Sequence, residues 1–407
     1  MSVGLRVEGV SAEALVRRYG TPLYVYSAGE VRARFSALRR AFRRRDPLIC
    51  YALKANSNRA VCAILARAGA GADIVSAGEL VRALRAGFDP AKTVFSGVGK
   101  TEEEMAAGLR AGLLAFNVES SEELDALARV AGRLKRRAPI SIRLNPDVSV
   151  RTHPHITTGT AENKFGVEAA EAFALYRRAA RDKRLRVVGV QCHIGSQITD
   201  LGPYRLAAKS IAKTVKRLQD SGIRLSQIDV GGGIGITYKD EKPLALPALA
   251  RILEEAFAPW PEARLLLEPG RFLTADAGLL LTRVLYRKRT SKRRFVIVDA
   301  AMTDLPRPAL YDAWHPVEAV RPRMGRRELM DVVGPVCESG DFLARERRLP
   351  PLERGDLLAV GKAGAYGFAM SSQYNSRPRA AEVLVDGGRA RLARRRETLK
   401  DLTAAEI

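Results

Sequence analysis

The chain alternates short apolar runs with segments of helical periodicity over more than half of its length. This alternation predicts parallel βαβ units, because parallel strands need a long crossover that is usually a helix. The apolar runs fall at residues 48–53, 72–75, 93–95, 114–118, 140–144, 187–192, 228–230 and 265–267. The segments between them that show helical spacing include 58–68, 79–86, 102–109, 122–134 and 204–218. Eight parallel strands are what a (β/α)₈ barrel requires, and a doubly wound sheet is the alternative, since strand count alone does not close a barrel.

The pattern changes after residue 271. Val, Thr, Tyr and Phe then alternate with polar residues at 283–285, 295–298, 357–360 and 381–385, and helical periodicity fades. This texture predicts an antiparallel β domain, built as a sandwich or a barrel. We therefore expect three parts: an N-terminal segment 1–27 whose strand at 23–26 joins the β domain, an α/β barrel at 28–275, and a C-terminal β domain at 276–407.

The chain is strongly basic, with 68 Lys and Arg against 45 Asp and Glu and a formal net charge of +23. A nucleic-acid-binding protein is one interpretation of such a charge. However, the Arg-rich runs at 39–45, 133–137, 287–294 and 321–327 are scattered, and no aromatic residues alternate with them to form a stacking surface. A solvated basic surface is the simpler interpretation, and nucleic acid is kept only as a distant alternative.

Composition also bears on the compartment. No apolar stretch approaches the roughly 20 residues that a membrane span needs, and residues 1–20 lack the apolar core of a signal peptide. The four cysteines form no CxxC pattern, so we expect reduced thiols in a cytoplasmic protein without a membrane partner.

Polar residues follow several of the apolar runs. Barrel active sites lie at the C-terminal ends of the strands, so these residues would converge on one site although they come from different strands. They are Lys54, Asp73, Arg143, Asn145, His193, Ser196, the glycines 231–233, Glu268 and Arg271.

Two of these positions bear directly on a bound cofactor. A lysine at the end of a buried strand is costly unless it is paired or used chemically, although Lys54 could also extend to solvent. The loop Gly231 to Gly233 lets backbone N–H groups approach a phosphate, although it could also be a flexible turn. It is a poor dinucleotide motif, because the third glycine would fall at Ile236. The sequence 99–101, GKT, resembles the end of a P-loop, but Val94 stands where the first glycine is needed.

The remaining residues suggest a planar cofactor. Glu268 could hold a protonated pyridine nitrogen, or it could cap a helix or form an ion pair. His193 could stack on an aromatic ring, or it could be a buried core histidine. His153 and His155 lack a third ligand, so we expect no metal.

Further candidates lie in the β domain. Cys337, followed by Glu338, could act as a general acid, although a buried inert thiol is the default interpretation. Arg307, Tyr311 and Tyr366 lie on loops shaped by proline or glycine, and their side chains suit carboxylate and phosphate recognition.

Together these segments resemble the fold type III pyridoxal-phosphate decarboxylases, and within that family the diaminopimelate decarboxylases. The matching stretches, in the family's order, are YALKAN at 51–56, HPHITTG with NKFG within 153–166, HIGSQ at 193–197, GGGIG at 231–235, EPGR at 268–271, RPALYDAWH at 307–315, GPVCESGD at 334–341 and GAYG at 364–367. They span nearly the whole chain.

The resemblance implies a barrel plus a β domain, bound pyridoxal 5'-phosphate, and a homodimer with shared active sites. It implies that Lys54 links covalently to the cofactor, that His193 lies on the ring face and that Glu268 holds the pyridine nitrogen. The implied cofactor-binding set is Lys54, Asp73, His193, Ser196, Gly232, Gly233, Glu268, Gly270, Arg271 and Tyr366. The implied substrate-binding set is Arg271, Arg307, Tyr311, Glu338 and Tyr366. The implied catalytic residues are Lys54, His193 and Cys337.

The implied reaction is decarboxylation of meso-2,6-diaminopimelate to L-lysine and CO₂, the last step of lysine biosynthesis. Cys337 and Glu338 would reach in from the other subunit. Ornithine decarboxylases look similar but carry Asp after the cysteine, so Glu338 favours a substrate whose far end is an amino-acid group. A decarboxylase of ornithine, lysine or arginine is the nearest alternative, whereas a racemase usually offers the pyridine nitrogen an arginine. Two departures are the strong basic charge and Ala301 with Thr303, where Gly and Asn are more usual.

Overall fold

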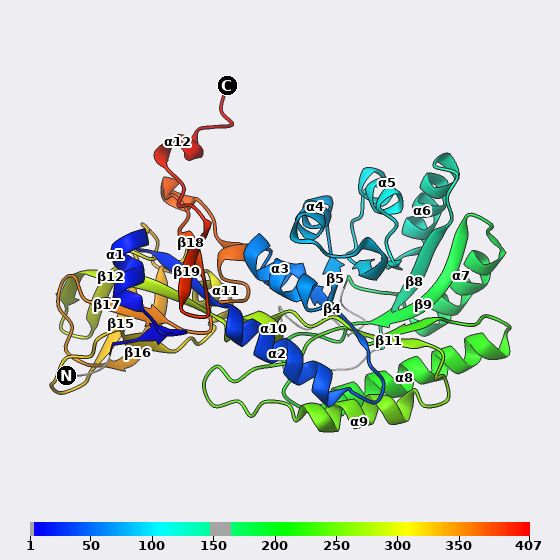
Figure 1. The fold of residues 1–407 in the computed structure, drawn as a ribbon, viewed down its shortest axis with the longest axis horizontal. Helices are drawn as coiled ribbons and strands as arrows, with labels where there is room; N and C mark the ends of the chain where they lie inside the picture. Colours follow the sequence, from blue (N-terminus) through cyan, green and yellow to red (C-terminus); the bar gives the residue numbers. More distant parts are fainter. Residues whose placement is uncertain (1–3, 147–163) are drawn as a thin grey trace. The chain divides into compact units, whose positions relative to one another are not determined.

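The computed structural model describes residues 4–146 and 164–407, which form two compact units (Figure 1). The barrel unit comprises Arg34–Ile236 and Lys242–Phe272, and the β unit comprises Met1–Ala33, Thr237–Glu241 and Leu273–Ile407. The expected motif with His153 and His155 lies outside the described residues. Within the described ranges, no helix combines the length and apolar character needed to cross a bilayer.

The barrel unit is a closed ring of eight parallel strands in chain order, and β11 pairs with β4 to close it. The strands are β4 (Leu48–Ala52), β5 (Gly71–Ile74), β6 (Thr93–Phe95), β7 (Ala115–Val118), β8 (Ala138–Leu144), β9 (Leu185–Cys192), β10 (Gln227–Asp229) and β11 (Arg264–Leu267). Each expected apolar run overlaps one of them. The closed ring confirms the barrel and excludes the doubly wound sheet.

Helices connect the strands and surround the ring (Figure 1). They are α2 (Ala28–Ala41), α3 (Arg59–Arg67), α4 (Ala77–Ala86), α5 (Glu102–Ala111), α6 (Ser121–Arg133), α7 (Ala169–Arg181), α8 (Leu201–Asp220), α9 (Leu246–Ala256) and α10 (Arg271–Thr274), with 3₁₀ turns at η1 (Leu53–Ala55) and η2 (Pro90–Lys92). Ser76, Thr101 and Ser120 cap α4, α5 and α6 by accepting a hydrogen bond from the backbone three residues on. Each such cap is worth about 1 kcal/mol, and it fixes where the loop from a strand end becomes a helix.

The β unit is built on a nine-stranded sheet with the order β16-β15-β13-β12-β3-β18-β19, in which β17 pairs with β12 and β14. Its strands are β3 (Leu23–Ser27), β12 (Gly278–Arg289), β13 (Arg294–Val298), β14 (Val317–Ala319), β15 (Glu328–Val333), β16 (Phe342–Leu349), β17 (Leu357–Val360), β18 (Ala381–Asp386) and β19 (Arg389–Arg394). The smaller elements are β1 (Arg6–Val7), β2 (Val10–Ser11), α1 (Ala12–Tyr19), α11 (Arg307–Tyr311), η4 (Phe368–Met370), η5 (Tyr374–Ser376) and α12 (Leu399–Leu402).

Two strand pairs of this sheet, β13 with β15 and β18 with β3, are parallel. The expectation of an antiparallel domain is wrong at these two pairs, whereas the other strand pairs of the sheet are antiparallel. A long connection carrying α11 separates β13 from β15, and most of the chain separates β3 from β18. Both connections are long enough for the crossover that parallel pairing requires.

Strand β3 lies at the centre of the β unit, between β12 and β18. Leu23 and Val25 are buried in a core cluster that includes Leu281 and Val383. The buried Tyr24 hydroxyl donates to the Asp304 backbone carbonyl at 2.7 Å. An N-terminal strand therefore joins the C-terminal sheet by pairing and by core packing.

Candidate active site

Lys54 lies in η1, directly after strand β4, and its ammonium group faces strand β5. Its Nζ atom is 3.1 Å from Asp73 Oδ2, and the Asp73 side chain is fully buried, whereas the Lys54 side chain is 38% exposed. Asp73 lies within β5 itself, one strand along the ring. The buried carboxylate thus holds an amine that is still reachable, which suits a lysine used for chemistry better than one extended to solvent.

His193 follows strand β9, and its ring is held by the glycine loop after β10. The Gly232 N–H donates to His193 Nδ1 at 3.1 Å, so the proton of a neutral ring lies on Nε2. Desolvation lowers the pKa of His193 well below its usual range, and the positive charges of Lys54 and Arg143 lower it further. The ring is therefore neutral near pH 7 and can lie against an aromatic cofactor without carrying a charge.

Glu268 follows strand β11 and is buried against two side-chain amides. Asn117 Nδ2 donates to Glu268 Oε1 at 3.3 Å, and Gln191 Nε2 donates to Glu268 Oε2 at 2.9 Å. Burial raises the pKa of Glu268 well above its usual range, and the charges of Asp229 and Asp73 add to this effect. The interpretation of Glu268 as a helix cap has no support in these contacts.

Glu268 and its two amide partners belong to a group of five buried side chains inside the ring that we call the acceptor cluster. Its members are Asp73, Asn117, Gln191, Asp229 and Glu268. Four of its oxygen atoms are buried and meet no hydrogen-bond donor among the described residues: Asp73 Oδ1, Asn117 Oδ1, Gln191 Oε1 and Asp229 Oδ2. Because buried acceptors are normally satisfied, an excess of them indicates a ligand that brings protons, such as a protonated ring nitrogen.

The glycine loop after β10 is packed too closely for side chains. A Cβ atom on Gly232 would lie 2.1 Å from the Glu268 carbonyl oxygen, and one on Gly233, whose φ is +90°, would lie 2.4 Å from the Gly195 carbonyl oxygen. Beside it, the buried Arg271 donates from Nη2 to Ser196 Oγ at 3.1 Å. Close backbone, a hydroxyl and a guanidinium group form a site suited to a phosphate.

Gly270 completes the barrel residues that the sequence indicated. A Cβ atom there would lie 3.0 Å from the Ala55 side chain. The structure thus brings nine expected residues to one end of the ring: Lys54, Asp73, His193, Ser196, Gly232, Gly233, Glu268, Gly270 and Arg271. An amine, a flat neutral ring, a carboxylate for a ring nitrogen and a phosphate site are the parts that pyridoxal phosphate needs, so these residues fit it.

Sequence reasoning did not identify Asn117, Gln191 or Asp229 as site residues. All three are polar residues in buried segments of barrel strands. Such a residue is costly to bury alone, so this pattern was the available signal. Arg143, which the sequence did indicate, pairs with the buried Glu119 at 3.0 Å.

The other expected residues belong to the β unit. Arg307 begins helix α11 and is buried, and Tyr311 ends the same helix. Arg307 Nη1 donates to His315 Nε2 at 2.8 Å, and the guanidinium lies 4.7 Å from the centre of the Tyr238 ring. His315 in turn lies 2.9 Å from the Gly361 carbonyl through Nδ1, so it presents Nε2 as the acceptor that orients Arg307.

Cys337 and Glu338 are exposed in the turn between β15 and β16, so the buried inert thiol is not what the structure shows. The Cys337 N–H donates to Asn375 Oδ1 at 2.8 Å, which fixes the turn. Tyr366 lies after β17 with a positive φ of 57°, a conformation that is costly for a residue with a side chain.

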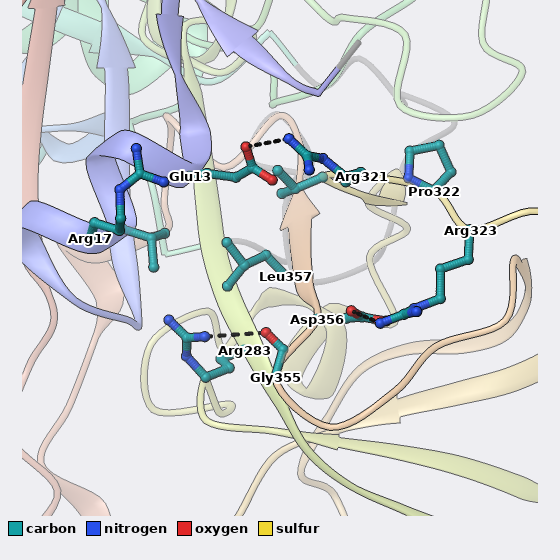
Figure 2. A pocket seen from close by; sticks show the side chains of 11 residues that line it. Glu13, Arg17, Arg283, Arg321, Pro322, Arg323, Gly355, Asp356 and Leu357 are labelled. Carbon is teal, nitrogen blue, oxygen red and sulfur yellow. Dashed lines mark hydrogen bonds and ion pairs between the residues drawn. The ribbon is translucent and has the colours of Figure 1, made fainter. Parts of the chain in front are cut away.

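A cavity of about 530 Å³ in the β unit holds none of the expected site residues. Figure 2 shows three of its four arginines beside partners: Arg321 with Glu13, Arg323 with Asp356, and Arg283 with the Gly355 carbonyl. Two of these arginines are already paired with carboxylates, and the lining includes none of the expected site residues, so the barrel residues remain the candidate active site.

The chain matches known proteins over almost its full length. Residues 28–275 match the family described as pyridoxal-dependent decarboxylase, pyridoxal binding domain. The diaminopimelate decarboxylase of Pseudomonas aeruginosa is 53% identical over 99% of this chain and 96% of its own, and that of Neisseria meningitidis is 49% identical over 98% of both.

Solved structures agree with these matches. The diaminopimelate decarboxylase of Helicobacter pylori, complexed with L-lysine, has a TM-score of 0.94 and 44% identity over 97% of this chain and 98% of its own. That of M. jannaschii, in co-complex with L-lysine, has a TM-score of 0.94 and 37% identity over 99% of this chain and 96% of its own. The chain therefore belongs to the diaminopimelate decarboxylase family of pyridoxal-dependent decarboxylases.

Proposed function

We propose that this protein decarboxylates meso-2,6-diaminopimelate to L-lysine and CO₂ with pyridoxal phosphate, as the last step of lysine biosynthesis. The observation that carries this proposal is Glu268, a buried carboxylate held by two amides at the same end of the ring as Lys54. The relatives named above, two of them complexed with L-lysine, which would be the product here, support the choice of substrate.

Different barrel residues would hold different parts of the cofactor. Lys54 would hold it covalently, with Asp73 positioning the amine, and Glu268 would accept a hydrogen bond from the protonated ring nitrogen. Ser196, Arg271 and the glycine loop would hold the phosphate, together with Gly270 and Tyr366. When bound, the cofactor supplies a sink for the electron pair that remains on Cα as CO₂ leaves.

Residues of the β unit, together with Arg271, would bind the substrate. Arg307, with Arg271, Tyr311 and Tyr366, would bind substrate carboxylate, because a guanidinium group forms paired hydrogen bonds with that group. Glu338 would bind the ammonium group at the far end of the substrate. The far end of meso-diaminopimelate is an amino-acid group, whereas ornithine and lysine carry only an amine there.

Proton delivery to Cα is assigned to Cys337. Cys337 and Glu338 would act at the active site of the second subunit of a homodimer, since both lie exposed on a turn. The free thiols Cys50, Cys62 and Cys192 suit the reducing cytoplasm, where the enzyme would work.

CO₂ release tests the proposal. The protein is incubated with pyridoxal phosphate and, in parallel, with meso-diaminopimelate, ornithine, lysine or arginine. Release from meso-diaminopimelate alone, with L-lysine formed in equal amount, is the expected result. Release only from another amino acid would keep the fold and the cofactor but overturn the role given to Glu338.

A further inference from the structure

Asp229 ends strand β10 inside the ring, next to the residues that hold Glu268. It pairs in register with Gln191 of β9 and with Leu266 of β11. Parallel neighbours in register point their side chains to the same face, so Asp229 and Gln191 both face the ring interior. Asp229 is 1% exposed, and its Oδ1 accepts a hydrogen bond from the Gly231 N–H at 2.8 Å.

The carboxyl groups of Asp229 and Glu268 are neighbours in the ring interior: the Gly231 N–H donates to Asp229, the Gly231 carbonyl accepts from the Glu268 N–H at 2.8 Å, and each carboxyl group acts on the charge of the other. Both oxygens of Glu268 also accept from the amides of Asn117 and Gln191, and no N–H or O–H donor of the described residues reaches Asp229 Oδ2. Two ionised carboxylates in buried contact repel strongly, and a single shared proton removes the repulsion and supplies the missing donor.

The charges around the two carboxyl groups favour a state in which the pair binds one proton. Asp73 adds a negative charge, whereas Lys54 and Arg143 are the neighbouring cations. Burial raises the pKa of Asp229 to about 7 and raises that of Glu268 well above its usual range. Both shifts favour a proton bound to the pair.

Among the described neighbours, the buried thiols and His193 do not supply that proton. Burial raises the pKa of Cys192 to about 12 and that of Cys50 well above its usual range, so both thiols stay neutral. His193 stays neutral as well, because desolvation lowers its pKa.

We propose that Asp229 is a positioning residue for Glu268: the two buried carboxyl groups share one proton, which Asp229 donates to Glu268 while Glu268 holds the ring nitrogen of the cofactor. The inference rests on the proposed function, which places that nitrogen at Glu268. A donor on Glu268 reduces its basicity, and the ring nitrogen then keeps its own proton. Asp229 thus acts on the electron sink without touching the substrate.

Binding of pyridoxamine 5'-phosphate to the full chain freed of cofactor tests this role by calorimetry. This probe has the ring and the phosphate but cannot form the covalent link to Lys54. Asp229→Asn keeps a donor toward Glu268 and an acceptor for Gly231, so its dissociation constant should stay within about threefold of the wild type. Asp229→Leu removes the donor and should weaken binding about 10- to 100-fold, as expected for a hydrogen bond to a charged group.

A second probe separates this role from a structural one. This probe is the analogue with carbon in place of the ring nitrogen. It has no ring N–H from which Glu268 could accept a hydrogen bond. Asp229→Leu should then change the affinity by less than about threefold, a difference of under roughly 0.7 kcal/mol. If Asp229→Leu weakened the binding of both probes equally, Asp229 would only support the loop. If Asp229→Asn and Asp229→Leu weakened the binding of pyridoxamine phosphate equally, the negative charge of Asp229 would be what matters. Either result overturns the proposal.

Infrared spectroscopy of the wild-type protein gives an independent readout that needs no variant to fold. The wild type at pH 7 should show a C=O stretch from a protonated buried carboxyl group that is lost in the difference spectra of Asp229→Asn and Glu268→Gln. No such band overturns the proposal. Failure of the wild type to bind pyridoxamine phosphate overturns both the proposal and the proposed function, whereas binding without release of CO₂ from meso-diaminopimelate removes only the substrate assignment.

Discussion

Replacement of Lys100 by methionine should destabilise the barrel unit far more than a surface lysine would. The Lys100 side chain is 1% exposed and lies 2.7 Å from Glu123 Oε1, whose side chain is 7% exposed. Lys100 Nζ also donates to the carbonyls of Gly97 at 2.6 Å and Asn117 at 2.8 Å. Methionine has a similar length but no donor. Lys100→Met therefore leaves a buried carboxylate and two backbone carbonyls without their partner.

The expected loss of unfolding free energy is about 3–5 kcal/mol, the usual cost of removing one partner from a buried ion pair. Lys216 provides a matched control, since it lies 2.6 Å from Asp220 but the side chains are 65% and 58% exposed. Lys216→Met should cost less than about 1 kcal/mol, because exposed ion pairs contribute little. Lys100→Met combined with Glu123→Gln should recover about 2 kcal/mol, because the unpaired charge is then gone.

The loss of unfolding free energy in Lys100→Met should also depend on pH. Burial already raises the pKa of Glu123 above its ordinary value of 4.5, and removal of Lys100 takes away the charge that opposes this rise. A carboxyl group with a raised folded pKa binds its proton more tightly in the folded state, so stability falls as pH rises from the unfolded pKa through the folded one. The deficit of Lys100→Met should therefore be smaller at pH 5.5 than at pH 7.5.

Urea unfolding of wild type and variants at both pH values measures these differences. The reasoning is refuted if Lys100→Met costs no more than Lys216→Met at pH 7.5. A deficit that grows toward low pH would contradict the account of the Glu123 charge.

Three further substitutions test the site. Cys337→Ala should keep bound cofactor but lower kcat by about 10²–10⁴, the usual contribution of a general acid, and unchanged turnover would exclude this thiol as the proton donor. Gly233→Ala should weaken cofactor binding, because its Cβ would lie 2.4 Å from a carbonyl oxygen. Gly222→Ala is the control, since Gly222 has a similar φ of +81° but no atom within 4 Å of the added Cβ, and it should leave binding unchanged. Equal effects of the two substitutions in a binding titration would refute the role of close packing. Glu338→Gln should raise KM for meso-diaminopimelate at unchanged cofactor affinity, and steady-state kinetics with an unaltered KM would remove Glu338 from the substrate site.

The barrel could be predicted because its signals are local. Each strand is a short apolar run, each helix has its own periodicity, and the polar residue after a run marks the strand end. Lys54, His193 and Glu268 were indicated in this way, and the structure brings them to one end of the ring.

The interior partners could not be assigned from sequence. Asn117 is visible as a polar residue in an apolar strand, but its partner Glu268 is 151 residues away and depends on closure of the ring. Lys100 resembled part of a phosphate loop, whereas the structure shows a buried lysine that holds Glu123. Both contacts follow from the registers of neighbouring strands and the packing of helices on them, which a single sequence does not specify.

The parallel pairing of β18 with β3 was missed for a similar reason. The alternation of residues in each strand indicates a half-buried sheet but not the direction of its neighbour. That direction depends on a contact between opposite ends of the chain, at residues 23–27 and 381–385.

The most direct test of the central claim is to locate the lysine that carries the cofactor. The protein is loaded with pyridoxal phosphate, reduced with borohydride, digested and mapped by mass spectrometry, with Lys54→Ala treated in parallel. The account predicts a phosphopyridoxyl group on Lys54 and none in the variant. A label on another lysine, or an equally labelled variant, would contradict it.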